Sequence, residues 1–214
     1  MGKQFGGPFA NWTKKVGNVV AREVQGRTIL SIYQPNVSNP RTNAQMAGRQ
    51  KFSLLSKLGG TLSTALRAGF KTLDGYKTGT YFSAFLGYNY KKSPFTGSYP
   101  NIELNLGQVV IAEGNLMQAF NPSVTADSGT ATFIWSDNSG QGNALGTDQA
   151  CCAIYNKLKD VAVFDLGSTT RSDRTVNVTL PSAWNGDSCD VWFFMMDETR
   201  NLVSDSLHLG TITA

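Results

Sequence analysis

The second half of the chain is a succession of short apolar runs separated by turn-forming residues, and this pattern limits the folds open to it. Turn clusters such as DNSG at 137–140 and NGD at 185–187 separate the runs. The predicted strands are 108–113, 130–135, 150–155, 160–164, 175–180, 190–196 and 202–209. Short strands at this spacing are typical of two packed antiparallel sheets. Residues 101–214 are therefore predicted to form an immunoglobulin- or fibronectin III-like β-sandwich, with Trp135 and Trp192 in the core between its sheets.

The beginning of the chain predicts a β-hairpin. The runs 16–24 and 27–33 are rich in β-branched residues and flank Gln25 and Gly26. Glycine at the second turn position tolerates a positive φ angle, which suits a tight two-residue turn. Pro35 then ends the second run, because proline has no amide hydrogen to donate to a neighbouring strand.

A helical pattern follows the hairpin. Thr42 and Gln45 have the spacing of a helix capping box, and apolar residues over 44–70 recur mostly every three or four positions. A glycine pair at 59–60 is expected to divide this pattern into two helices. Residues 1–100 are therefore predicted to be a basic module of one hairpin and two helices with an aromatic-rich link, so the whole chain is predicted to be α+β.

Charge is divided unevenly along the chain. Residues 1–92 carry fourteen Lys and Arg against two acidic residues, a formal charge of +12, whereas 93–214 carry five against thirteen, a charge of −8. A basic half attracts polyanions such as nucleic acids. The alternative is that the two halves attract each other, within one chain or head to tail between copies. Candidate contacts to nucleic acid or to an acidic partner are Lys14, Lys15, Arg22, Arg27, Arg41, Arg49 and Lys51.

Aromatic residues are concentrated in two segments of the basic half. The glycine-rich N-terminal arm contains Phe5, Phe9 and Trp12. This arm is expected either to fold back on its own domain or to insert into a neighbouring subunit. The segment 76–100 combines tyrosines and phenylalanines with Lys91 and Lys92, a composition that suits core and interface packing or the stacking of single-stranded bases.

The sequence contains little that predicts catalysis. His208 is the only histidine, and Ser204, Asp205 and Ser206 lie near it in sequence, but a catalytic triad needs partners from separate elements. His208 is therefore expected to be an edge-strand residue at the rim of a sheet. The loop 137–143 is rich in oxygen ligands but lacks the acidic residue that completes an EF-hand. We expect no enzyme activity, no metal and no cofactor.

The cysteines and the apolar runs indicate whether disulfides, secretion or a membrane span are expected. Adjacent cysteines on a strand point to opposite faces, and an odd number of cysteines favours free buried thiols over a disulfide framework. The three cysteines are Cys151, Cys152 and Cys189. The N-terminus has no apolar core of a signal peptide, and no run reaches the length of a membrane span, so neither secretion nor a membrane span is expected.

Several motifs resemble those of a family known only as a domain of unknown function, found in Bacteroidetes and in phages that infect them. The motifs are KVGNVV at 15–20, NPRTNAQ at 39–45, RQKF at 49–52, FTGSYPNIEL at 95–104, VVIAEGNL at 109–116, TFIWSDNSGQGNA at 132–144 and SLHLG at 206–210. The chain departs from the family pattern at Ala21 and at the turn after Val24. The resemblance implies a basic hairpin and helix module joined to a β-sandwich, and it supplies no catalytic residues.

These observations favour a non-enzymatic structural or accessory protein of a bacteriophage particle, assembled with other virion proteins and with copies of itself. The expected location is the virion, after synthesis in the host cytoplasm. One alternative is a nucleic-acid-binding module that uses the basic half. Another is a carbohydrate- or receptor-binding sandwich, in which an exposed Trp184 or the tyrosine-rich segment stacks on a sugar.

Overall fold

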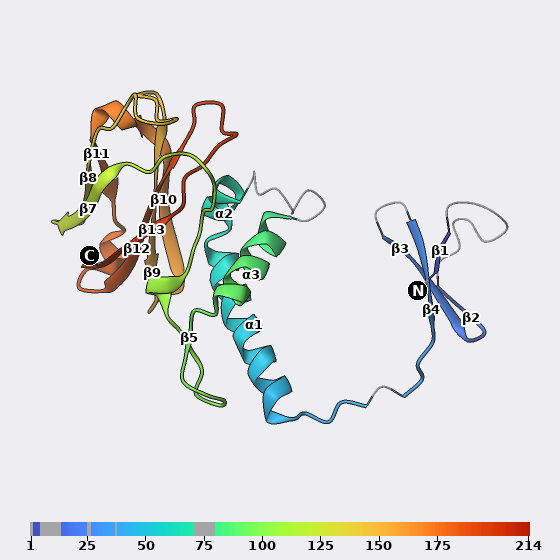
Figure 1. Cartoon of the computed structure of the whole chain (residues 1–214). Coiled ribbons are helices and arrows are strands. Elements are labelled where there is room, and N and C mark those ends of the chain that lie inside the picture. The colour runs from blue at the N-terminus through green and yellow to red at the C-terminus, as the bar shows by residue number, and fades with distance from the viewer. Residues whose placement is uncertain (1, 5–13, 25–26, 37, 71–79) are drawn as a thin grey trace. The chain divides into compact units, whose positions relative to one another are not determined.

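The computed structural model describes residues 2–4, 14–24, 27–36, 38–70 and 80–214, and it shows an α+β protein of helices and antiparallel sheets (Figure 1). The chain divides into two compact units, Met1–Thr42 and Asn43–Ala214. The sequence predicts a boundary after residue 100, whereas the structure groups the helices with the strands that follow them.

The first unit contains one antiparallel sheet in the order β1-β4-β3-β2. Its strands are β1 Gly2–Gln4, β2 Lys14–Val16, β3 Val19–Val24 and β4 Arg27–Ile32. The predicted hairpin is confirmed, since β3 and β4 pair up to Val24 and Arg27. The turn at Gln25 and Gly26 lies outside the described residues. The prediction of one strand over 16–24 is wrong, because Gly17, with a φ angle of 57°, turns the chain between β2 and β3.

Three helices begin the second unit: α1 Asn43–Thr61, α2 Ser63–Gly69 and α3 Tyr81–Lys92. The first starts directly after Thr42, as the capping pattern predicts. The predicted division into two helices is present, but its position is wrong, since α1 continues through the glycine pair and the break falls at Leu62. Gly59 serves packing instead, because a Cβ atom there would lie 2.8 Å from the Phe85 ring of α3. Glycine therefore lets the two helices approach each other closely.

The third helix was not expected in the aromatic-rich link. Its N-cap is Thr80, whose hydroxyl accepts a hydrogen bond of 3.2 Å from the Ser83 amide, and its C-cap Ser93 is left-handed with a φ angle of 55°. The buried Asn89 side chain donates to the Val110 carbonyl at 2.8 Å and accepts from the Val110 amide at 2.9 Å. These bonds fix the irregular segment after the helix.

Two larger antiparallel sheets complete the second unit, in the orders β10-β9-β12-β13 and β11-β8-β7, with a small β5-β6 pair beside them. The strands are β5 Phe95–Thr96, β6 Glu103–Leu104, β7 Phe120–Asp127, β8 Thr130–Ser136, β9 Gln149–Asn156, β10 Val161–Thr170, β11 Thr175–Thr179, β12 Ser188–Met196 and β13 Leu207–Thr213. Short 3₁₀ turns are η1 Leu106–Gln108, η2 Arg171–Asp173 and η3 Ser182–Trp184.

Most predicted strands of the second half are present, with four differences. Strands β8, β9, β11 and β12 match the predicted runs, whereas β10 continues to Thr170, six residues beyond the predicted run 160–164. The run 108–113 is not a strand, since Asn89 and Ser206 take up its backbone amides. β7 was not predicted, because its sequence contains Pro122. The last strand begins at Leu207 rather than at residue 202, and before it Val203 forms only a single bridge to Met196.

Both faces of the four-stranded sheet are buried, which gives the second unit three layers. Alternate residues of β9 and β12, such as Cys152 and Phe193, pack toward the three-stranded sheet, whereas Cys151 and Trp192 pack toward the helices. Figure 1 shows the helices against one side of the sheets. The cysteines are free and buried, and the adjacent pair faces opposite ways, as the sequence predicts.

The two tryptophans predicted between the sheets lie in different layers. Trp135 is there, with its ring centroid 5.3 Å from that of Phe193. The prediction for Trp192 is wrong, because its position in β12 turns it toward the helices, where its ring nitrogen donates to the Val109 carbonyl at 3.0 Å. Among the described residues, no helix is long and apolar enough to cross a membrane.

Candidate functional site

The residues around His208 form structural contacts. His208 lies on the edge strand β13, as predicted, with its Nε2 atom 2.9 Å from Asp190 Oδ1 and its ring against Trp192. Ser204 accepts a hydrogen bond of 2.9 Å from the Met195 amide, and Ser206 accepts one of 2.9 Å from the Ile111 amide. These serines therefore hold neighbouring backbone and do not meet the histidine as a nucleophile would.

The oxygen-rich loop after β8 is also held by internal bonds. Asp137 accepts a hydrogen bond of 2.9 Å from the Ser139 amide and another from the Ser139 hydroxyl. These bonds lower the pKa of Asp137, the hydroxyl having the larger effect. Within the part of the chain that the structure describes, no three His, Cys, Asp or Glu side chains gather as metal ligands would.

Beneath this loop lies a buried ion pair. The Arg171 side chain, which is fully buried, donates to Asp148 Oδ2 from Nε at 3.1 Å and from a terminal nitrogen at 2.9 Å. It also donates to the Asn138 side chain at 2.6 Å and to the Met117 carbonyl at 2.7 Å. The guanidinium thus ties together three segments at one end of the sheets. All of these partners belong to loops of the same unit, so this cluster stabilises the loops.

A second polar cluster joins α1 to the turn between β9 and β10. Asp160 accepts a hydrogen bond of 2.8 Å from the Tyr155 hydroxyl, and its other oxygen lies 3.1 Å from Lys57 Nζ. Burial, followed by the contacts with Asp160, raises the pKa of Tyr155 well above its usual value. Tyr155 therefore stays protonated and acts as a donor to the carboxylate. This cluster fixes the helix on the sheet.

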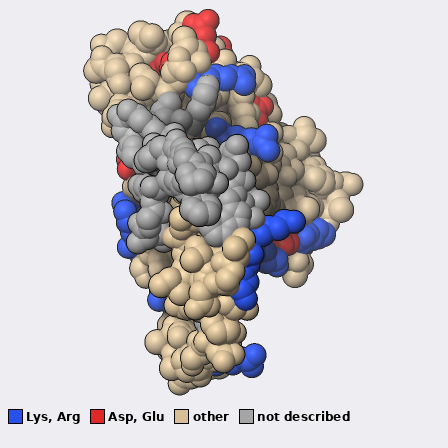
Figure 2. All heavy atoms as spheres, turned by 90° about the vertical axis from the view of Figure 1, so that its right-hand side faces the viewer, with Lys and Arg blue, Asp and Glu red and all other residues tan. Residues whose placement is uncertain are grey.

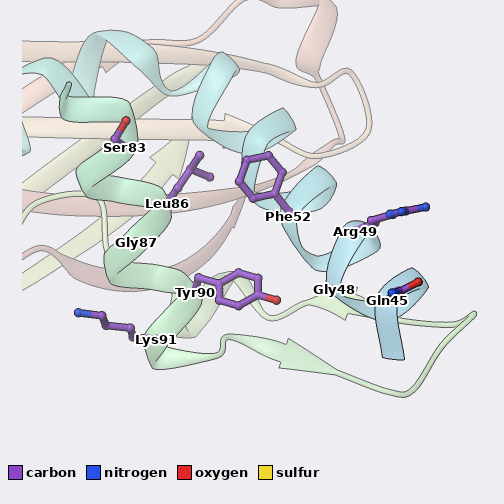
Figure 3. Close-up of a pocket in the computed structure, with 9 residues that line it drawn as sticks. All are labelled: Gln45, Gly48, Arg49, Phe52, Ser83, Leu86, Gly87, Tyr90 and Lys91. Carbon is purple, nitrogen blue, oxygen red and sulfur yellow. The ribbon is translucent and has the colours of Figure 1, made fainter. Parts of the chain in front are cut away.

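An open groove of about 950 Å³ lies between α1 and α3 (Figure 3). Its lining residues come from the first three turns of α1 and from the last three turns of α3: Gln45, Gly48, Arg49, Phe52, Ser83, Leu86, Gly87, Tyr90 and Lys91. Figure 3 shows Phe52 and Tyr90 directed toward the space between the helices, whereas Arg49 and Lys91 extend away on either side. The groove thus has an apolar interior and basic margins.

The groove is formed by aromatic walls and by residues that lack side chains. Phe52 and Tyr90 remain 53% and 45% exposed, respectively, although both are large and apolar. Gly48 has no side chain to fill the space beside Tyr90, since a Cβ atom there would lie in contact with the Tyr90 hydroxyl, at 3.6 Å. The Tyr90 ring is held edge-on by Phe95, with centroids 6.2 Å apart. Part of the wall is therefore already ordered before anything binds.

The margins of the groove carry positive charge. Over residues 43–92 the sequence contains eight Lys and Arg and a single acidic residue, Asp74, which lies outside the described residues. None of the residues that line the groove is acidic. Among the coloured side chains visible in Figure 2, which draws both units, blue Lys and Arg predominate over red Asp and Glu. The groove therefore favours a partner that combines apolar side chains with carboxylates or other anions.

The basic residues predicted from the sequence fall into two groups. Those of the first unit are Lys14, Lys15, Arg22, Arg27 and Arg41, and those on α1 are Arg49 and Lys51. Lys15 lies 3.5 Å above the centre of the Tyr33 ring, and Lys51 lies 5.2 Å from that of Phe95. Only Arg49 lines the groove. The Arg27 side chain lies outside the described set, as do all atoms of the predicted arm residues Phe5, Phe9 and Trp12.

Sequence reasoning missed the α3 side of the groove and misplaced a second tryptophan, Trp184, in addition to Trp192. The apolar residues Tyr81, Phe85 and Tyr88 recur at helical spacing after Thr80, which is a signal that could have predicted α3. Trp184 is only 3% exposed and belongs to the core between the sheets. The prediction of an exposed Trp184 that stacks on sugar is therefore wrong.

The fold and the groove define an α+β protein with a candidate docking site between two helices. A family model described as a family of unknown function (DUF6266) matches residues 10–210, so the chain belongs to this family. The match covers nearly all of both units. No curated protein and no solved structure gives a significant match.

Proposed function

We propose that this chain is a non-enzymatic structural or accessory protein of bacteriophage particles, associated with the capsid, the head-to-tail connection or the tail. It would act through protein–protein contacts and reside in the virion. The observation that carries the proposal is the groove between α1 and α3, where Phe52 and Tyr90 are exposed between basic margins. Exposed apolar patches rimmed by polar groups mark interaction sites in soluble proteins.

Two further observations support a role in assembly. His208 and Ser204 are engaged in contacts with a neighbouring side chain and with neighbouring backbone. Charged residues are only 16% of the chain, below the usual share of about 25%, so much of the surface consists of uncharged polar groups. Many weak contacts between such surfaces suit a repeating assembly. The origin in Bacteroidetes or their phages is proposed from the sequence motifs that resemble the family.

The finer fold assignment belongs to the same proposal. The sheets of three and four strands, in the orders β11-β8-β7 and β10-β9-β12-β13, support an immunoglobulin- or fibronectin III-like sandwich. In this arrangement the helices cover the face of the four-stranded sheet that such domains often leave to solvent. The sandwich would then be the scaffold that positions α1 and α3 for docking.

Mass spectrometry of purified particles tests the proposal. Phage particles from a culture that expresses the chain would be banded by density and digested, and peptides of both units should be found in the particle fraction at a constant ratio to the capsid protein. A soluble host protein recovered from the same culture serves as the contamination control. Detection of the chain in the lysate but not in banded particles would contradict the proposal.

Nucleic-acid binding is the second candidate, and the charge of residues 43–92 favours it. Fluorescence anisotropy with labelled single- and double-stranded DNA would measure this directly. Binding through phosphates should weaken by about a hundredfold or more when NaCl rises from about 50 to about 200 mM, because neutralised phosphates release counterions. The double variant R49E/K91E should then bind more weakly still. Absence of binding at the lower salt concentration removes this candidate.

A further inference from the structure

We infer that copies of this chain associate head to tail, with the β12–β13 turn of one copy seated in the α1–α3 groove of the next. This inference rests on the proposed role in assembly and names a partner for the same groove. We choose a second copy of the chain as the partner because the turn carries an exposed apolar side chain and carboxylates, whereas no residue that lines the groove is acidic. The relevant residues all belong to the second unit.

The β12–β13 turn presents an apolar side chain on a preformed support. Leu202 is 43% exposed, although it is aliphatic. The Asp197 carboxylate accepts hydrogen bonds of 2.6 Å from the Asn201 amide and of 2.6 Å from the Leu202 amide, and it also accepts one from the Thr199 hydroxyl. A turn held in this way loses little conformational freedom when it binds, which favours its use as an inserted element.

The charges of the turn and of the groove are opposite. Within residues 197–205 the sequence has three acidic residues, Asp197, Glu198 and Asp205, against Arg200. Arg200 lines a separate depression beside α2, together with Arg67. Glu198 and Asp205 are exposed, so their carboxylates can approach Arg49 and Lys91 of another copy. Complementary charges of this kind steer association and fix its register.

The positions of the two elements exclude contact within one copy. Figure 1 shows the connection from β12 to β13 at one end of the sheets, and the beginning of α1 beyond the other end. The hydrogen bond between Thr61 and Asp160 places the end of α1 beside the β9–β10 turn, at that second end. In a head-to-tail arrangement each copy inserts its turn into one neighbour and receives the turn of another, so the contact is heterologous. Repetition of such a contact produces a ring or an open filament.

Two variants that each remove one side of the contact test this inference. Phe52→Ser disables the groove, and Leu202→Ser disables the turn, so each variant alone should be monomeric. An equal mixture should form one-to-one dimers, because one intact turn still meets one intact groove and growth then stops. Multi-angle light scattering measures all three states. Each substitution should weaken self-association by about 30-fold, as expected for an anchor residue.

Controls separate this contact from loss of folding and from other surfaces. Phe120→Ser changes a phenylalanine of similar exposure, 44%, on β7, and should leave association unchanged. Circular dichroism should show that all variants remain folded. If wild type assembles but the mixture of the two variants stays monomeric, or if each variant still assembles alone, the inference is wrong.

A charge exchange gives a second readout that does not depend on apolar truncation. K91E and E198K should each weaken association by about tenfold, because each places like charges across the contact. The double variant K91E/E198K should recover most of the loss. If the loss of affinity in the double variant equals the two single losses combined, the proposed contact between Lys91 and Glu198 is contradicted. A wild-type chain that stays monomeric would overturn this inference alone, since mass spectrometry of particles decides the proposed function independently.

Discussion

The two units of the chain differ in how far they bury their apolar residues. In the second unit both faces of the four-stranded sheet are covered, one by the three-stranded sheet and one by the helices. Among the described residues of the first unit, only Ala21 and Thr28 are buried, while Val16 and Ile32 are 58% and 77% exposed. Burial of apolar surface is the main stabilising term in folding. Among the described residues, the buried apolar surface that stabilises the fold therefore lies mostly in the second unit.

Loss of the buried ion pair should have the largest effect on the second unit. Arg171→Met leaves Asp148 buried without its cation, so we expect the free energy of unfolding to fall by about 3–5 kcal/mol. Urea denaturation followed by tryptophan fluorescence measures this change. The matched control is Arg174→Met, an exposed neighbour, which should change stability by less than about 0.5 kcal/mol. Equal effects of the two substitutions would show that the buried cluster is not a special source of stability.

Alanine substitutions at the two glycines of α1 should separate the effect of helix packing from the effect of helix propensity. Gly59→Ala forces a methyl group against Phe85, so we expect a loss of about 1–3 kcal/mol of unfolding free energy. Nothing lies within 4 Å of a Cβ atom at Gly60, and Gly60→Ala should stabilise the protein by up to about 1 kcal/mol. Thermal unfolding of both variants measures the difference. The same sign for both would contradict the close approach of α1 and α3.

Acid should weaken the attachment of α1 to the sheet. Burial alone would raise the pKa of Asp160, but the hydrogen bonds from Tyr155 and Lys57 outweigh it and lower this pKa. A depressed pKa in the folded state means that Asp160 stabilises the protein above the unfolded value of about 4, and that this contribution is lost as pH falls below it. Asp160→Asn should reduce the dependence of stability on pH between about 4 and 2, by no more than about 1 kcal/mol because the group is partly exposed. Unchanged pH dependence in denaturant titrations would refute this assignment.

Removal of the first unit should have the smallest effect. A chain that begins at Asn43 retains both core clusters, so its unfolding free energy should lie within about 0.5 kcal/mol of that of the whole chain. Denaturant titration of the two chains provides the comparison. A large loss of stability would mean that the first unit contributes to the core of the second.

The sequence predicted elements that are determined by local chemistry. The start of α1 followed from Thr42 and the spacing after it, and β8, β9, β11 and β12 followed from apolar runs bounded by turn residues. The third helix was missed because glycine and aromatic residues obscured its periodicity. The burial of both faces of β12 was missed although its run VWFFMM does not alternate, a pattern typical of a strand covered on both sides.

The groove could not have been predicted from any single segment. It depends on two helices that are separated in sequence and approach each other closely at Gly59, while Gly48 and Gly87 line the groove farther along. Spacing within one helix identifies its apolar residues but not which of them a second helix will leave uncovered. Phe52, which the sequence pattern did not single out, is one of the most exposed aromatic residues among those described.

Sedimentation velocity of the wild-type chain tests head-to-tail docking at the groove most directly. The chain would be measured from about 1 µM to about 1 mM, at low and at high salt. We predict a monomer of 23.1 kDa at the lowest concentration, species larger than a dimer at the highest, and a return toward monomer as salt screens the contact between the groove and the turn. A single monomeric species at all concentrations would contradict this account.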